Sequence, residues 1–176
     1  LEILIPFFLV FEGRKPQARE LILISALCAI AVASRTAFFM LPQVKPMLAL
    51  IIVFGICFGA ETGFLVGAVS AFASNLFFGQ GPWTPWQMFT FGIIGFLAGF
   101  LHKKGVLKKT TLSLCIFGAL SAFVVYGGIM NTSSLLLWQQ NPEQTFWVSY
   151  LLTGVPMDLI HALSTVVFLF LISRPF

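Results

Sequence analysis

The stretch Asn75-Leu-Phe-Phe-Gly-Gln-Gly-Pro-Trp-Thr-Pro-Trp-Gln-Met88 separates two long apolar runs with a polar residue and a rigid loop. Pro82 and Pro85 lack an N–H group and bias the residues before them away from helix. Trp83 and Trp86 are amphipathic rings, which settle at the boundary between membrane and water. The stretch therefore predicts a stiff aromatic loop that joins two membrane spans at one face of the membrane.

The composition of the 176-residue chain indicates an integral membrane protein. Hydrophobic residues make up 59% of the chain and charged residues 9%, whereas a soluble domain carries roughly 25% charged residues. The alternating strands of an outer-membrane barrel are absent from the sequence. Because a helix satisfies its own backbone polar groups in lipid, we expect an all-α membrane protein.

The apolar runs predict a six-helix bundle preceded by part of an extra helix. The six expected spans cover about residues 21–41, 47–59, 64–78, 86–101, 112–130 and 146–172. Residues 60–63 are expected to form a turn, and residues 131–145 a polar loop. Residues 1–10 are too short to cross by themselves, since a crossing needs about 20 residues. We therefore expect residues 1–18 to be the end of an N-terminal helix with a linker, and residues 19–176 to form the membrane domain.

The basic residues predict the orientation of the bundle. Of the ten Lys and Arg side chains, only Arg35 and Lys45 fall on one side of this layout. The other eight fall on the opposite side, at Arg14, Lys15, Arg19, Lys103, Lys104, Lys108, Lys109 and Arg174. Positive charge accumulates on the cytoplasmic side of membrane proteins. Both ends of the six-helix core are therefore expected in the cytoplasm, with the Trp83 loop outside the cell.

Small residues recur at four-residue spacing on three of the spans, where they let helix backbones approach closely. The ladders are Ser25, Ala29 and Ala33, then Gly63, Gly67 and Ala71, then Gly95 and Gly99. Such ladders usually pack within one chain, and this is the expectation for the two glycine ladders.

Ionisable and amide side chains within the spans point to a functional site, since such groups are costly in the membrane. Arg35 and Asn75 lie in the outer parts of the first and third spans, and Asp158 and His161 share one face near the middle of the sixth. A polar pocket that opens outward beneath the Trp83 loop follows from these depths. The alternative is a structural ion pair between Asp158 and either Arg35 or His161.

Several activities lack their motifs. The sequence contains no Gly-x-x-x-x-Gly-Lys-Ser/Thr nucleotide loop and no His-Glu-x-x-His zinc motif. Cys28, Cys57 and Cys115 lie within apolar runs without a Cys-x-x-Cys pair, and we expect buried free thiols. The basic residues sit in short loops between spans, so we expect no nucleic-acid partner. We predict no enzymatic activity, no cofactor and no metal site.

Four runs of the sequence resemble the S components of energy-coupling factor (ECF) transporters, and the subgroup associated with cobalamin and its precursors most closely. They are Ser34-Arg-Thr-Ala-Phe-Phe-Met-Leu-Pro-Gln-Val-Lys-Pro46, Gly59-Ala-Glu-Thr-Gly-Phe-Leu-Val-Gly67, Gly79-Gln-Gly-Pro-Trp-Thr-Pro-Trp-Gln87 and Pro156-Met-Asp-Leu-Ile-His161. The resemblance implies a prokaryotic cell-membrane subunit that captures a vitamin outside the cell. It also implies two kinds of partner, a transmembrane coupling protein and two cytoplasmic ATPases. In that family an Ala-x-x-x-Ala motif on the first span docks on the coupling protein, and Ala29 and Ala33 match it.

The predicted ligand site combines polar groups from the spans with aromatic residues near the Trp83 loop. Its residues are Arg35, Phe38, Phe39, Asn75, Gln80, Trp83, Trp86, Asp158 and His161. Pockets for small molecules are mostly apolar with a few fixed polar groups. The alternative function is a stand-alone carrier or channel that uses Asp158 and His161 as a proton relay. An intramembrane enzyme is the third possibility, and the missing motifs disfavour it.

Overall fold

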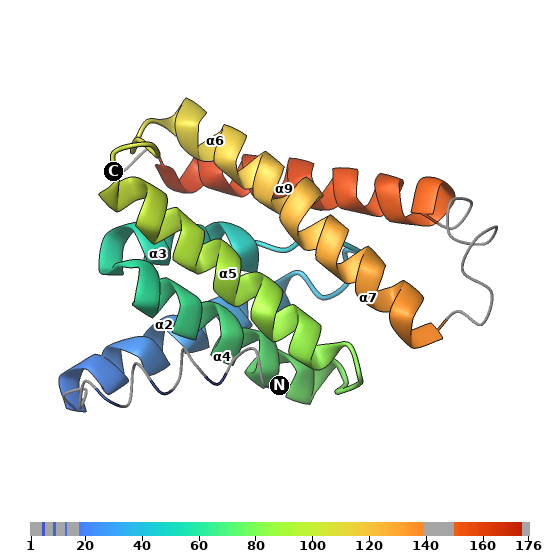
Figure 1. The fold of residues 1–176 in the computed structure, drawn as a ribbon, viewed down its shortest axis with the longest axis horizontal. Coiled ribbons are helices and arrows are strands. Elements are labelled where there is room, and N and C mark those ends of the chain that lie inside the picture. Colours follow the sequence, from blue (N-terminus) through green and yellow to red (C-terminus); the bar gives the residue numbers. More distant parts are fainter. Residues whose placement is uncertain (1–4, 6–8, 10–12, 14–17, 139–149, 174–176) are drawn as a thin grey trace.

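The structure is a computed structural model that describes residues 18–138 and 150–173, together with Ile5, Leu9 and Gly13. These residues form an all-α bundle, as predicted, with its helices running roughly along one long axis (Figure 1). The α-helices are α2 (Ala18–Ala37), α3 (Met47–Phe58), α4 (Ala60–Phe78), α5 (Thr84–Lys103), α6 (Thr111–Leu120), α7 (Gly128–Trp138) and α9 (Val155–Ser173). Two π-helical segments, η2 (Ser121–Gly127) and η3 (Tyr150–Gly154), adjoin α7 and α9.

Five of the helical segments are long and apolar enough to cross a membrane. They cover Ala18–Ala37, Ala60–Phe78, Thr84–Lys103, Thr111–Leu137 and Leu152–Ser173. The sixth, α3, has only 12 residues, or about 18 Å at 1.5 Å per residue, against a hydrocarbon core of about 30 Å. Most of α3 is buried, and it packs against α2, α4, α5 and α9. Its apolar run therefore belongs to a helix enclosed by its neighbours.

The most extensive helix contact among the described residues joins α4 to α5, and glycines make it possible. A Cβ atom on Gly63 would lie 2.5 Å from the carbonyl oxygen of Gly95. A Cβ atom on Gly67 would lie 2.6 Å from the carbonyl carbon of Phe91. Both distances are far below an ordinary carbon contact, so the two backbones touch through positions without side chains. The expectation that the glycine ladders pack within the chain is confirmed.

Two predicted loops are shorter than expected. The predicted turn at residues 60–63 is wrong, because α4 already begins at Ala60 and only Gly59 breaks the chain, with φ 99°. Glycine adopts this backbone conformation without steric cost. The predicted loop from residue 131 is also wrong at its start, because α7 continues to Trp138. Hydroxyl groups such as Thr132 Oγ1, which donates to the Gly128 carbonyl at 2.7 Å, allow this polar segment to remain helical.

The fifth span is continuous but changes its hydrogen-bond pattern in the middle, at η2, between α6 and α7. A second π-helical turn, η3, immediately precedes Pro156 in α9. Proline removes a helix donor and crowds the preceding turn, which explains why the π-helical segment lies just before Pro156. π-helical turns occur frequently at functional sites, and both segments lie in the half of the bundle formed by α6 to α9.

Other expectations fall partly outside the described residues. The extra helix predicted within residues 1–10 and the start of the sixth span at residue 146 belong to this group.

The three cysteines are free, but only Cys28 is buried, whereas Cys115 is half-buried and Cys57 is exposed. Cys57 is exposed because it lies near the end of α3, at the junction with α4.

Candidate functional site

A cavity of about 150 Å³ lies where the C-terminal end of α2 meets α3, α5, η2 and α9. Polar side chains make up much of its wall. The lining residues are Arg35, Gln43, Lys45, Met47, Leu48, Gln87, Phe91, Tyr126 and His161. They come from α2, the α2–α3 connection, α3, α5, η2 and α9, so the cavity exists only in the assembled bundle.

Arg35 occupies the last turn of α2 and reaches across to the end of α4. One guanidinium nitrogen donates to Ser74 Oγ at 2.5 Å and to Asn75 Oδ1 at 3.0 Å. The guanidinium carbon lies 4.7 Å from the centroid of the Phe78 ring, within the range of a cation–π interaction. These contacts fix the position of the charge beside the cavity.

Asn75 connects Arg35 to the beginning of α5. Its side chain is buried, with 1% of its surface exposed. While Oδ1 accepts from Arg35, Nδ2 donates to Thr84 Oγ1 at 3.2 Å and to Gln87 Oε1 at 2.7 Å. Thr84 Oγ1 also accepts from the backbone N–H of Gly81 at 3.2 Å. Asn75 therefore ties the Trp83 loop and α5 to the arginine, although it does not line the cavity itself.

The opposite wall is formed by aromatic groups from η2, α5 and α9. The Tyr126 ring meets the His161 ring edge-on at a centroid distance of 4.5 Å and the Phe91 ring at 5.2 Å. His161 is 4% exposed, and its Nδ1 atom is buried without a hydrogen-bond partner among the described residues. An unpaired buried polar atom is costly, so this nitrogen is available for a ligand or a bound water.

The connection between α2 and α3 closes the remaining side with Gln43 and Lys45. The Lys45 ammonium donates to the carbonyls of Phe38 at 2.6 Å, Leu41 at 3.0 Å and Phe39 at 3.3 Å. These bonds use the three N–H donors of the group. Burial, together with the Arg35 guanidinium, lowers the pKa of Lys45 from its ordinary value. The Lys45 backbone N–H donates to Ser164 Oγ of α9 at 3.2 Å.

Asp158 lies one turn from His161 on α9 but has a different environment. Its Oδ2 accepts from Asn131 Nδ2 at 2.6 Å. The carboxylate packs on Gly127, where an added Cβ would lie 2.6 Å from the carboxyl carbon. Asp158 is absent from the residues that line the cavity. Neither Arg35 nor His161, the two charge partners considered from the sequence, pairs with Asp158. The Asn131 amide is its hydrogen-bond partner instead.

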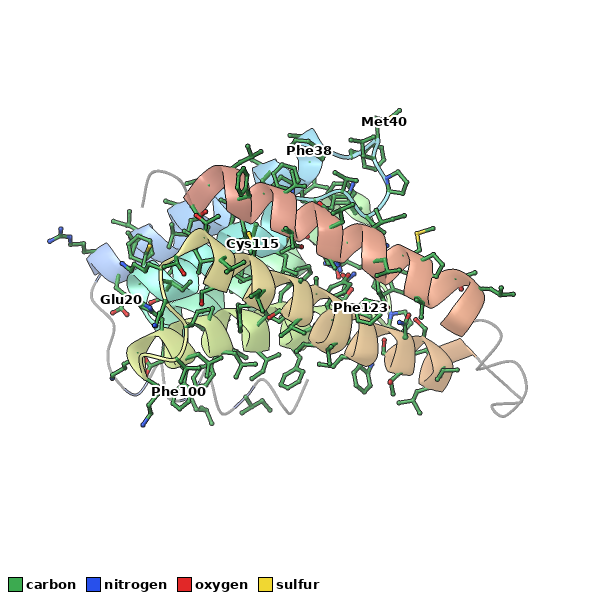
Figure 2. All side chains as sticks on the ribbon, turned by 90° about the horizontal axis from the view of Figure 1, so that it is seen from above. Glu20, Phe38, Met40, Phe100, Cys115 and Phe123 are labelled. Atoms are coloured by element: carbon green, nitrogen blue, oxygen red, sulfur yellow. The ribbon has the colours of Figure 1, made fainter. Side chains whose placement is uncertain are left out.

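The structure brings only part of the predicted site residues together. Arg35 and His161 line the cavity, and Asn75 holds Arg35. Phe39 is 59% exposed, and Phe38 packs edge-on against Phe168. Figure 2 shows Phe38 at the periphery of the bundle, close to the exposed Met40.

The residues predicted on the Trp83 loop also lie outside the cavity lining. Gln80 is exposed and donates to the Phe72 carbonyl at 3.1 Å. The Trp83 ring covers Gly81. Trp86 lies in the first turn of α5, and its carbonyl accepts from Thr90 Oγ1 at 2.6 Å. Whether any of these residues contacts a ligand stays a prediction.

Sequence reasoning missed several lining residues, chiefly Gln43, Lys45, Gln87 and Tyr126. Lys45 and Gln43 sit between Pro42 and Pro46, where they resembled ordinary loop residues. Tyr126 is one of only two tyrosines in the chain, and its hydroxyl within an apolar span was a usable signal. Gln87, a polar residue at the end of the run Gly79–Gln87, was a second usable signal.

A shallow groove lies on the outer face of α2 and α4. Ala29 and Ala33 are exposed within it. The other residues that line the groove are Ser25, Cys28, Val32, Thr36, Ala37, Val69, Ala73 and Phe77. The opposite face of α2, formed by Ile24, Leu27, Cys28 and Ala31, is the buried one. The alanine ladder therefore does not pack within the described bundle, unlike the glycine ladders.

Comparisons with known proteins identify relatives of the chain. A family model described as "ECF-type riboflavin transporter, S component" matches residues 17–174. A UPF0397 protein of Vibrio atlanticus is 29% identical over 92 residues, which cover 51% of this chain and 50% of the relative. A UPF0397 protein of Aliivibrio salmonicida is 30% identical over 80 residues, or 46% of this chain and 42% of the relative. The matches thus span half or less of these curated relatives, and no solved structure matches.

Proposed function

Because the chain belongs to the family of ECF-type riboflavin transporter S components, we propose that it is the substrate-binding membrane subunit of a vitamin uptake transporter. In this proposal it captures a vitamin on the outer side of a prokaryotic cell membrane. A separate coupling protein, driven by two cytoplasmic ATPases, then releases the vitamin into the cell. The single observation that carries the proposal is a polar cavity near one end of a bundle of apolar helices.

The cavity has the make-up of a small-molecule site. Arg35 and Lys45 bring charge, Gln43, Gln87 and His161 bring hydrogen-bonding groups, and Phe91 and Tyr126 bring aromatic surface. Ligand pockets combine apolar walls with a few fixed polar groups in this way. The hydrogen bonds from Arg35 to Ser74 and Asn75 hold its charge in place before a ligand arrives, which reduces the ordering cost of binding.

The size of the vitamin is the finer part of the proposal. Sequence resemblance favours cobalamin or a cobalamin precursor, whereas the matching family is described by riboflavin. A cavity of about 150 Å³ is below the roughly 300–1,000 Å³ of typical ligand pockets, and a corrinoid would require the bundle to open widely. We therefore favour a vitamin of one to three fused rings. Mass spectrometry of the molecule that copurifies with the chain would decide between the classes.

The groove that holds Ala29 and Ala33 is the proposed contact with the coupling protein. Exposed small residues allow a partner helix to approach closely in the membrane, and both alanines are exposed. Ala29→Leu and Ala33→Leu are expected to abolish assembly with the coupling protein while the isolated chain still binds its ligand. Loss of ligand binding together with assembly would instead mean that the substitutions damage the bundle.

Copurification tests the proposed function directly. The tagged chain should capture a membrane coupling protein and two ATPases from its own cells, and uptake should stop when ATP is depleted. A stand-alone carrier, the alternative class, predicts uptake by the purified chain alone in proteoliposomes with a pH gradient. Asp158 and His161 would be the proton relay of such a carrier. This alternative requires protons to pass between the two side chains, although only His161 lines the cavity.

A further inference from the structure

The cavity carries positive charge without a matching negative group. Arg35 and Lys45 line it, and none of the lining residues within the described chain is an aspartate or a glutamate. The carboxylate of Asp158 on neighbouring α9 accepts a hydrogen bond from Asn131 and packs on Gly127. Partly buried cations without a counter-ion are unfavourable in a medium of low dielectric constant. A negatively charged ligand would relieve this cost.

The hydrogen-bonding groups that remain available at the cavity also favour a negatively charged ligand, because they are donors. Because Gln87 Oε1 accepts from Asn75, the amide group of Gln87 that remains for other partners is its NH₂, a donor. Arg35 uses a single nitrogen for Ser74 and Asn75, which leaves further N–H groups of its fork. Guanidinium and amide donors suit the oxygens of a carboxylate or phosphate.

His161 supplies an independent observation. Its side chain is 4% exposed, it lines the cavity, and Nδ1 has no hydrogen-bond partner among the described residues. Buried polar atoms are normally satisfied, so an unsatisfied one in a cavity wall marks a position where a ligand or water completes the site. The Tyr126 ring stands edge-on to this imidazole and close to Phe91, which adds an aromatic wall.

We propose that the cavity recognises a planar aromatic vitamin through an oxyanion, a carboxylate or a phosphate, that the ligand carries. Arg35 binds the oxyanion directly, and Lys45 contributes its positive charge while its N–H groups remain on the backbone carbonyls of residues 38, 39 and 41. Gln87, Tyr126 and His161 surround the ring. This inference rests on the proposed function and specifies the substrate class of the same site.

Matched pairs of probes test the charge requirement with the full chain in detergent or nanodiscs. Nicotinate carries an anionic carboxylate where nicotinamide carries a neutral carboxamide. Riboflavin 5′-phosphate carries a phosphate that riboflavin lacks. Isothermal titration should show that the anionic member of at least one pair binds about tenfold or more tightly than its neutral member. Which pair responds distinguishes a carboxylate from a phosphate. Equal or tighter binding of the neutral members, or no saturable binding of either anion, would overturn the inference.

Two charge-removing variants locate the effect. Lys45→Met removes one of the two cavity charges and keeps an apolar side chain of similar length. It should reduce the anion's affinity about fivefold or more, and by clearly more than it reduces the affinity of the neutral probe. Lys109→Met removes a charge from an exposed position outside the cavity and should change neither. Equal effects of the two variants would contradict the proposal. Elution profile and helical content of each variant establish that it is folded.

The outcome separates the inference from the proposed function. If riboflavin binds and the coupling protein copurifies, but anions show no advantage, the chain is a vitamin-binding S component with a charge-independent site. If neither copurification nor binding is observed, both the inference and the proposed function fail. Copurification does not depend on the charge of the ligand, so the two results are read separately.

Discussion

Gly67→Ala should destabilise the protein, because position 67 lies where α4 and α5 touch. An added Cβ would lie 2.6 Å from the Phe91 carbonyl carbon and 2.8 Å from the Gly92 nitrogen. The Phe91 carbonyl oxygen would lie closer still, and ordinary contacts begin at 3.4 Å. The two helices must therefore separate locally by at least about 0.8 Å, the difference between 2.6 and 3.4 Å. The contacted atoms all belong to the backbone of α5, which cannot move aside as a flexible side chain can.

The expected magnitude follows from two opposing terms. Overpacking a close contact costs about 1–3 kcal/mol, while glycine to alanine within a helix returns about 0.5–1 kcal/mol. A net loss of about 1–2 kcal/mol is expected for Gly67→Ala. Gly128→Ala in α7 is the matched control, because nothing lies within 4 Å of its added Cβ, and it should be neutral or slightly stabilising.

Thermal unfolding of the two variants in the same detergent provides the assay. For a chain of this size about 1 kcal/mol shifts the melting temperature by roughly 2–4 °C, so Gly67→Ala should melt about 2–8 °C below the unmodified protein. Gly128→Ala should melt at or above it. A Gly67→Ala protein as stable as the Gly128→Ala protein would refute the argument that backbone contact holds α4 against α5.

Three further predictions concern the site and the orientation. Asp158→Asn should leave ligand affinity within about threefold, because Asp158 does not line the cavity and asparagine retains an oxygen for Asn131; a tenfold loss measured by titration would place the residue in the site. Asn75→Asp should weaken anion binding about tenfold or more, since its carboxylate would neutralise Arg35, and unchanged affinity would contradict this. In a cysteine-free background, a membrane-impermeant thiol reagent applied to intact cells should label a cysteine at exposed Gln80 and not one at exposed Lys104, and the reverse pattern would invert the topology.

The sequence predicts the number and order of the helices well, because each apolar run is bounded by proline, glycine or charge. It predicts the α4–α5 contact as well, since glycines at four-residue spacing on two consecutive spans have few other uses. The boundaries were harder to predict. One glycine, Gly59, suffices to separate α3 from α4, and Thr132 lets a polar segment continue α7 by donating back to the helix.

The site was predicted less completely, because depth along a span gives the height of a residue but not the direction of its side chain. Asp158 and His161 have nearly the same depth, yet the former contacts Asn131 and the latter contacts Tyr126. Lys45 was missed for another reason. It follows the first span in the sequence, and only the folded chain brings it back to three carbonyls and to the cavity.

The two walls of the cavity differ in chemistry and in the half of the bundle that provides them. Arg35 and Lys45 belong to α2 and its connection to α3, whereas Tyr126 and His161 belong to η2 and α9. Gly63 and Gly67 join α4 closely to α5. Among the described residues, the hydrogen bond from the α2–α3 connection to α9 is the one that the Lys45 backbone N–H donates to Ser164 Oγ at 3.2 Å. A ligand that contacts Arg35 on one side and the Tyr126 and His161 rings on the other would therefore connect the two halves. The binding energy of such a ligand would depend on how closely the two halves approach each other, so a movement that separates the halves would release the ligand.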